Sequence, residues 1–169
     1  MTKGRNANAR GQAAPMKQVP ADLAPPAGAT LAFKLGARGD QIYTCAAKPE
    51  DPAAFVWTFK APEAALLNDR NNVVGNHFAG PTWESPDGSS VKAKVIARVD
   101  APSKNAIPWL LLEATSHSGD GIFSSITHIQ RLATKGGVAP TKGCDAAHAG
   151  AEARVPYMAT YTFFNPASS

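Results

Sequence analysis

The residues best suited to chemistry gather in one short segment, residues 77–89. It holds His77, Trp83, Glu84 and Asp87 among Gly, Pro and Ser residues. This composition is typical of loops, and loops on a rigid scaffold often carry binding groups. His77 and Glu84 could act as base and acid or bind a metal, and Trp83 could stack on a sugar or an aromatic ligand. We therefore predict that these side chains lie on one rim of the fold.

The same segment also suits a purely structural role. Gly80-Pro81 and Asp87-Gly88 are ordinary turn dipeptides. Trp83 can fill the core, and His77 can hydrogen-bond a loop carbonyl. Both interpretations stay open, and substitution of Trp83 or His77 separates them. A ligand contact would lose binding at unchanged stability, whereas a structural residue would lose stability.

Two further candidates, His128 and Arg131, lie in a predicted strand. Neighbouring residues of a strand point to opposite faces, so His128 shares a face with Gln130, and Arg131 lies on the other face. Either one can approach the segment 77–89 only if the fold brings the two elements together. We include both as candidate binding residues.

Motifs for a metal, a cofactor or a nucleophile are absent from the sequence. The chain has no His-x-Glu-x-x-His or Cys-x-x-Cys spacing, so no metal site is expected. It has no Gly-x-Gly-x-x-Gly, so no dinucleotide or other cofactor is expected. Gly-x-Ser-x-Gly is missing as well. No catalytic residue is assigned.

Charge and hydropathy exclude two classes of partner. The net charge is +4, and the four basic residues Lys3, Arg5, Arg10 and Lys17 account for it, since all precede the first acidic residue, Asp22. A nucleic-acid-binding domain carries its basic excess on the fold, so no nucleic acid is expected as a partner. The chain has no run of 18 apolar residues, so no transmembrane segment is expected either.

The chain divides into a tail and one domain. Residues 1–29 are rich in Gly, Ala, Pro, Asn and Lys and contain few large apolar groups, which predicts a flexible basic tail. We expect residues 1–24 to lack regular secondary structure and to make few contacts with the core. Residues 30–165 are long enough for a single β domain, and residues 166–169 form the C-terminal end.

Short β-type runs separated by Gly, Pro, Asn and Asp make up that domain. Residues 91–99 alternate between apolar and polar, which predicts a strand with one buried face, whereas residues 157–164 are suited to burial on both faces. One short helix is predicted at Pro62–Asn68. The predicted strands are Thr30–Leu35, Gln41–Ala46, Ala54–Lys60, Val91–Val99, Trp109–Thr115, Ser125–Ala133 and Tyr157–Phe164. The fold class is therefore mainly β, a single-domain antiparallel β-sandwich or β-barrel with little helix.

Two cysteines bear on the compartment. Cys45 and Cys144 can be buried thiols or a disulfide, and a strand-like position paired with a Gly-flanked loop favours the disulfide. A bridge requires Cα atoms nearer than about 7 Å. Disulfides persist in oxidising compartments, which favours a secreted or periplasmic location. The N-terminus lacks the apolar run of a secretory signal, so this expectation assumes that a leader has been removed.

Ordered motifs between about Leu31 and Phe164 resemble one known family. They are Gln41–Cys45, Trp57–Ala64, His77–Glu84, Asp87–Ser89, Ile107–Leu112, Ile129–Arg131, Thr134–Pro140, Gly143–Asp145 and Tyr157–Tyr161. This set resembles the family of the domain of unknown function 3455, found in bacteria and fungi. The resemblance implies a secreted β fold with Cys45 paired to Cys144, and it implies no activity.

Three functions remain open. The preferred hypothesis is an exported binding module for a small molecule or a polysaccharide, with aromatic residues as contact faces. The second is a hydrolase-type or metal-assisted enzyme that uses His77 and Glu84. The third is a structural or assembly protein with a docking N-terminal tail. The position of His77 and Trp83 relative to a partly apolar cavity would best distinguish them.

Overall fold

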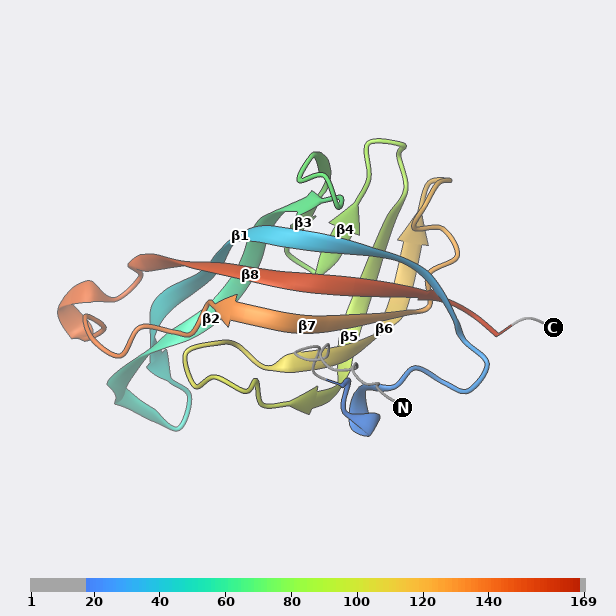
Figure 1. Cartoon of the computed structure of the whole chain (residues 1–169). Helices are drawn as coiled ribbons and strands as arrows, with labels where there is room; N and C mark the ends of the chain where they lie inside the picture. The colour runs from blue at the N-terminus through green and yellow to red at the C-terminus, as the bar shows by residue number, and fades with distance from the viewer. Residues whose placement is uncertain (1–17, 168–169) are drawn as a thin grey trace.

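The strands of this protein close into a barrel (Figure 1). The computed structural model describes residues 18–167. Each strand pairs antiparallel with the next, and β8 pairs with β1. The mainly β fold is thereby confirmed, and the barrel is realised rather than the sandwich. The elements in chain order are η1 (Ala21–Leu23), β1 (Thr30–Lys48), β2 (Asp51–Leu67), β3 (Val73–Phe78), β4 (Thr82–Glu84), β5 (Ser90–Val99), β6 (Trp109–Ser118), β7 (His128–Gly136), η2 (Ala146–His148) and β8 (Glu152–Asn165).

Strand β1 is longer than predicted, because the expected strands Thr30–Leu35 and Gln41–Ala46 are parts of one element. It pairs with β8 on one edge and with β2 on the other. Gly39 lies in the middle, where a Cβ atom would lie 2.2 Å from the carbonyl oxygen of Glu63. A glycine at this position lets the two backbones approach closely within a continuous strand.

The predicted helix Pro62–Asn68 is wrong, because residues up to Leu67 belong to β2. Ala64 and Leu66 are buried on the inner face of the barrel, and β2 pairs here with both β1 and β3. Helix propensity of a short Ala- and Leu-containing stretch is a weak preference, and pairing on both edges with burial of alternate residues overrides it.

The loop predicted over residues 77–89 is also wrong in part, because it includes the end of β3 and all of β4. The hairpin pairs His77 with Trp83 and Asn76 with Glu84. Gly80-Pro81 forms only the turn between the two strands. Strand β4 has three residues, which is too short for an alternating pattern to indicate a strand.

Aromatic side chains fill one end of the barrel, where β1 begins and β8 ends. The ring of Phe33 lies 4.9 Å from that of Phe163, and Phe123 lies 5.2 Å from Phe163. The loop between β6 and β7 contributes Phe123 and Ile126, both with no exposed area. The apolar core therefore closes this end, and the interior near the other end is free to hold a cavity.

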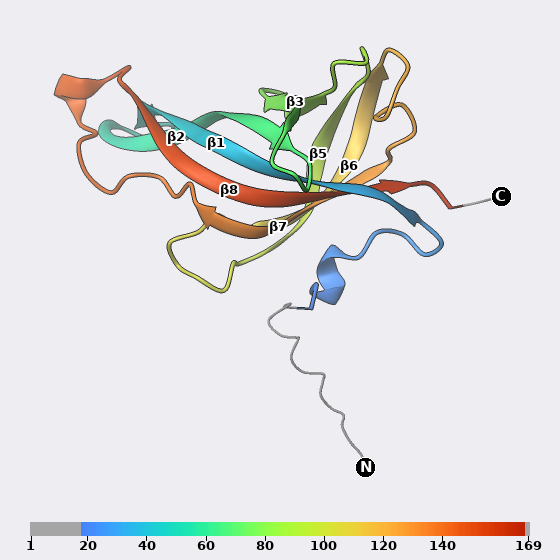
Figure 2. The ribbon, with the colours of Figure 1, turned by 45° about the horizontal axis from the view of Figure 1, so that its top comes forward.

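The segment before β1 packs on the outside of the barrel (Figure 2). Leu23, the last residue of η1, has no exposed area and packs with Trp109 and Leu111 of β6. The Gln130 side chain donates a hydrogen bond of 2.8 Å to the Leu23 carbonyl. The prediction of an unstructured tail up to residue 24 is wrong at these positions, because one buried leucine suffices to order its neighbours. Residues 1–17 lie outside the described residues.

The disulfide prediction is confirmed, because Cys45 and Cys144 are bonded with their Cα atoms 5.3 Å apart. Cys45 belongs to β1 and is almost fully buried, and Cys144 lies in the loop before η2. The bridge therefore ties the β7–β8 connection to the barrel wall.

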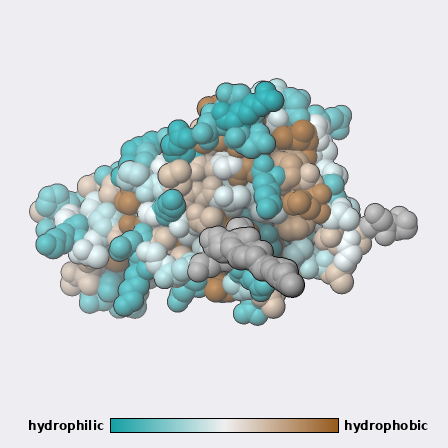
Figure 3. All heavy atoms as spheres, viewed as in Figure 1, coloured by the Kyte–Doolittle hydropathy of each residue, from teal (hydrophilic) through white to brown (hydrophobic). Residues whose placement is uncertain are grey.

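The face of the molecule in Figure 3 carries many hydrophilic residues. On the face in Figure 3, apolar residues form small groups among polar ones, as is ordinary for a solvent-facing surface. Between residues 18 and 167, the structure contains no helix of the length and apolar character needed to cross a membrane.

Candidate functional site

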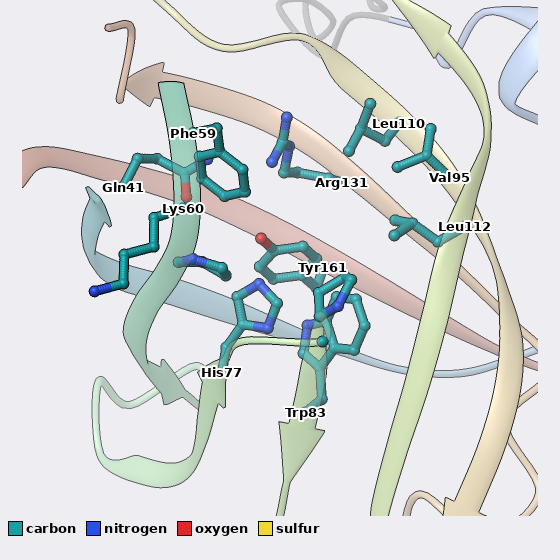
Figure 4. Close-up of a pocket in the computed structure, with 13 residues that line it drawn as sticks. Gln41, Phe59, Lys60, His77, Trp83, Val95, Leu110, Leu112, Arg131 and Tyr161 are labelled. Atoms are coloured by element: carbon teal, nitrogen blue, oxygen red, sulfur yellow. The ribbon is translucent and has the colours of Figure 1, made fainter. Parts of the chain in front are cut away.

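A cavity of about 260 Å³ lies inside the barrel. Every strand contributes at least one residue to its wall, so the cavity occupies part of the barrel interior. It is open to solvent beside Phe59 and Val95, which are half-exposed. The lining residues are Gln41, Phe59, Lys60, Pro62, His77, Gly80, Pro81, Trp83, Val95, Leu110, Leu112, Arg131 and Tyr161. Figure 4 shows the largest of these side chains converging from strands far apart in sequence.

Three aromatic rings form the floor of the cavity. His77 stacks on Trp83 with ring centroids 4.4 Å apart, and both rings meet Tyr161 edge-on at 5.0 and 5.5 Å. Their exposed fractions are only 3% for His77 and 1% for Trp83 and Tyr161. Edge-to-face and offset-stacked contacts of this kind stabilise a core beyond the burial of area alone. The floor is therefore rigid.

His77 is a neutral residue of this floor. Its Nδ1–H donates a hydrogen bond of 2.9 Å to the Thr82 carbonyl, which fixes the ring and leaves the lone pair on Nε2. Burial lowers the pKa of His77 to about 3, and the positive charge of Arg131 acts in the same direction. At neutral pH the ring is therefore uncharged, which disfavours a role as a general acid.

Arg131 is the central polar group of the wall. Its Nε and Nη2 both donate to the Pro108 carbonyl, at 3.1 and 2.9 Å. Nearby, the hydroxyls of Tyr157 and Tyr161 lie 3.1 Å apart. Burial raises the pKa of Tyr161, and the charge of Arg131 opposes that rise. Arg131 thus places a positive charge beside neutral, buried hydroxyls.

Two buried polar atoms of lining residues have no hydrogen-bond partner within residues 18–167. They are Oε1 of Gln41, an acceptor, and Nε1 of Trp83, a donor. Gln41 is 3% exposed. Buried polar atoms are nearly always paired, and an unpaired one costs about 1 to 3 kcal/mol. A ligand or a water in the cavity would supply the missing partners.

The structure brings together three of the six predicted site residues, namely His77, Trp83 and Arg131. Glu84 is exposed and neighbours Trp83 in the strand, so it points to the outer face of the barrel. His128 pairs with Glu113 and likewise lies on the outer face, where its Nε2 is 3.8 Å from a Glu113 carboxylate oxygen. The expected rim of His77 and Glu84 does not form, because adjacent strand residues face opposite sides.

Asp87 belongs to a turn that fastens two loops. Its Oδ1 accepts hydrogen bonds from the backbone N–H and the hydroxyl of Ser89, and its Oδ2 accepts one from the Ile122 N–H at 2.8 Å. Ser89 Oγ in turn accepts from the Phe123 N–H. Asp87 therefore holds the loop that brings Phe123 into the core, away from the cavity.

We expect Asp87→Asn to lower the thermal midpoint at neutral pH. Hydrogen bonds to Ser89 and Ile122 lower the pKa of Asp87 from 3.8 to about 2. The charged form is thus favoured in the folded state, so its contribution is present above about pH 4 and is lost as the pH falls toward 2. In melting curves recorded from pH 7 to 2, the difference in thermal midpoint between wild type and Asp87→Asn should shrink as the pH falls from about 4 to 2. Asp120→Asn in the neighbouring loop is the control, and an advantage that persists at pH 2 would contradict the prediction.

Some lining residues could have been found from the sequence and others could not. Tyr161 shares the alternating face of Tyr157 and Phe163, so its burial follows from the pattern. Gln41 and Val95 carry no such signal. Gln41 is a polar residue close to a glycine in β1, and Val95 is one of several valines in its strand, so neither stands out in the sequence. Across residues 18–167, no three His, Cys, Asp or Glu side chains are grouped so as to hold a metal ion.

Fold and cavity define a class: a closed, antiparallel eight-stranded β-barrel with an internal pocket, the size at which a barrel can hold one small ligand. The family described as "Protein of unknown function (DUF3455)" matches residues 26–165, and the chain belongs to this family. The predicted resemblance is confirmed. Comparison with curated proteins and with solved structures found no match.

Proposed function

We propose that this domain binds a small molecule inside its barrel and works in a secreted or periplasmic compartment. The observation that carries the proposal is the cavity of about 260 Å³, to which all eight strands contribute. Ligand pockets are concave, mostly apolar and furnished with a few fixed polar groups, and their usual range begins at about 300 Å³. The cavity matches this description in its lining and is slightly smaller than the usual range.

The size and burial of the site favour a small molecule over a polysaccharide. A polysaccharide needs an open groove or an exposed aromatic platform, whereas Trp83 is 1% exposed and is covered by His77 and Tyr161. The separation of His77 from Glu84 likewise favours binding over the hydrolase hypothesis. The burial of Leu23 against its own barrel gives no support to a docking tail over residues 18–29.

The compartment is supported by the disulfide. Cys45 and Cys144 are 99 residues apart in sequence, and their bond lies at a buried position of β1. Bridges of this kind form and persist in oxidising environments and are rare where thiols are kept reduced. Isolation of the protein from its native host, followed by mass spectrometry of alkylated samples, would test whether the bond is present there.

Blocking the cavity should abolish binding. We expect wild-type protein to bind at least one of two equally sized probes, neutral 2-naphthamide and anionic 2-naphthoate, in calorimetric titrations. Val95→Trp places an indole in the cavity from a position that is 46% exposed, and it should bind neither. The matched control is Ile96→Trp, which is equally exposed but does not line the cavity. Failure of the wild type to bind either probe, or equal binding by both variants, would contradict the proposal.

A further inference from the structure

We infer that the ligand is an amphipathic organic anion whose charged group is held by Arg131. The inference rests on the proposed function and adds the chemical class of the ligand. It starts from a guanidinium group that lines an internal cavity and has no carboxylate partner: none of the ion pairs within residues 18–167 involves Arg131. Arg131 is partly buried, and an anion entering the cavity would offset the cost of its incomplete solvation.

The guanidinium is oriented for binding before any ligand arrives. One carbonyl, that of Pro108, accepts from both Nε and Nη2 and so fixes the plane of the group. The remaining N–H groups, on Nη1 and the other side of Nη2, form the end of the fork. They lie beside the Tyr161 hydroxyl, whose pKa is raised by burial and lowered in part by a hydrogen bond to this guanidinium. That edge matches two oxygens of a carboxylate or a phosphate, and such charge-assisted, bidentate pairs are strong and specific.

No negative charge competes for Arg131 inside the barrel. Lys60 and Arg131 are the charged lining residues, and none of the described lining residues is Asp or Glu. Lys60 is ion-paired with Glu152, and Figure 4 shows its ammonium group pointing away from Arg131. His77 is neutral, because burial lowers its pKa. The interior is therefore positive at neutral pH.

A second arginine adds to the positive potential on the inner face of the barrel. Strand β5 has an irregular register between Val95 and Ala97, after which Arg98 pairs with Leu110. Directly paired residues share a face, and Leu110 lines the cavity, so Arg98 also lies on the inner face. It is exposed and has no ion-pair partner among residues 18–167. Charges of one sign at a low-dielectric opening attract ligands of the other sign.

Apolar side chains line the cavity beside the charged group, since Leu110 is the cross-strand partner of Arg131. Figure 4 shows Val95, Leu110 and Leu112 together to the right of Arg131, Gln41 to its left and Tyr161 below it. Gln41 Oε1 lacks a partner there. A ligand with an anionic end and an apolar or aromatic body satisfies both sides, whereas a fully polar ion leaves the leucines unfilled.

The test uses three probes with one aromatic body, namely 2-naphthoate, 2-naphthyl phosphate and 2-naphthamide, titrated calorimetrically into the whole chain. We expect one of the anions to bind about tenfold or more tightly than the neutral amide, as a charge-assisted hydrogen bond implies. The tighter of the two anions identifies the group that Arg131 holds. Arg131→Met should remove the preference, and Lys135→Met, an exposed change of the same charge on β7, should retain it.

Each outcome decides between the two proposals. If wild-type protein binds all three probes equally and Val95→Trp abolishes that binding, the anion inference is wrong and the proposed function stands. If no probe binds, both fail. Should Arg131→Met not fold, the comparison of charged and neutral probes on the wild type still decides. Retention of the full preference in a folded Arg131→Met variant would also overturn the inference.

Discussion

Removal of the disulfide is expected to lower the free energy of unfolding by about 4 to 5 kcal/mol. The bond closes a loop of 99 residues, and a crosslink of that span strongly restricts the unfolded chain. Because the net stability of such a domain is about 5 to 15 kcal/mol, the loss is a large part of the total. We expect the thermal midpoint of Cys45→Ala/Cys144→Ala to fall by about 10 to 20 °C.

Urea denaturation of the oxidised wild type, the reduced wild type and the double variant measures this effect. The reduced protein and the variant should agree closely, since both lack the crosslink. Any further decrease in the free energy of unfolding of the variant measures the packing of the Cys45 side chain, which is 1% exposed. A difference between oxidised and reduced wild type below about 1 kcal/mol would show that the loop is restrained by other contacts.

Replacement of Trp83 by Ala should cost about 3 to 5 kcal/mol, the range for deletion of a fully buried large aromatic side chain. Trp83 is 1% exposed and meets His77, Tyr161 and Phe163. Its removal would open a void directly beneath the cavity. A loss of this size would assign Trp83 to the floor of the cavity. Loss of an exposed, sugar-stacking tryptophan would instead leave the stability unchanged.

Trp57→Ala is the matched control, because Trp57 is only partly buried and bonds the Lys142 carbonyl at the outside of the fold. We expect a smaller loss for this variant. Unfolding should be followed by far-ultraviolet circular dichroism, since both substitutions change the fluorescence. Equal losses for the two variants would contradict the assignment of Trp83 to the core.

Sequence patterns anticipated strands wherever alternation ran for several residues. Val91–Val99 and Tyr157–Phe164 lie within β5 and β8, and His128 and Arg131 do occupy opposite faces of β7. The same approach missed β3, whose residues do not alternate between apolar and polar, and β4, whose three residues are too few for a period. It also placed a helix at Pro62–Asn68, because local propensity contains no information about pairing with β1 and β3.

From the sequence, we could predict only those residues of the candidate site whose type suggests chemistry. His77, Trp83 and Arg131 stand out by type, and all three line the cavity. Glu84 stands out equally, yet it faces outward because it neighbours Trp83 in a strand. Gln41 and Leu110 are unremarkable by type and reach the cavity through the register of a closed sheet. That register depends on pairing between distant segments, which no local pattern determines.

The pairing of the first strand with the last has a consequence for how the chain folds. Thr30 pairs with Asn165, so the barrel cannot close until nearly the whole chain is available. Folds dominated by contacts between distant segments form slowly, on the order of milliseconds to seconds, because loop closure precedes the stabilising contacts. During synthesis, β1 has no β8 to cover its edge, and the chain stays incompletely folded until its end emerges.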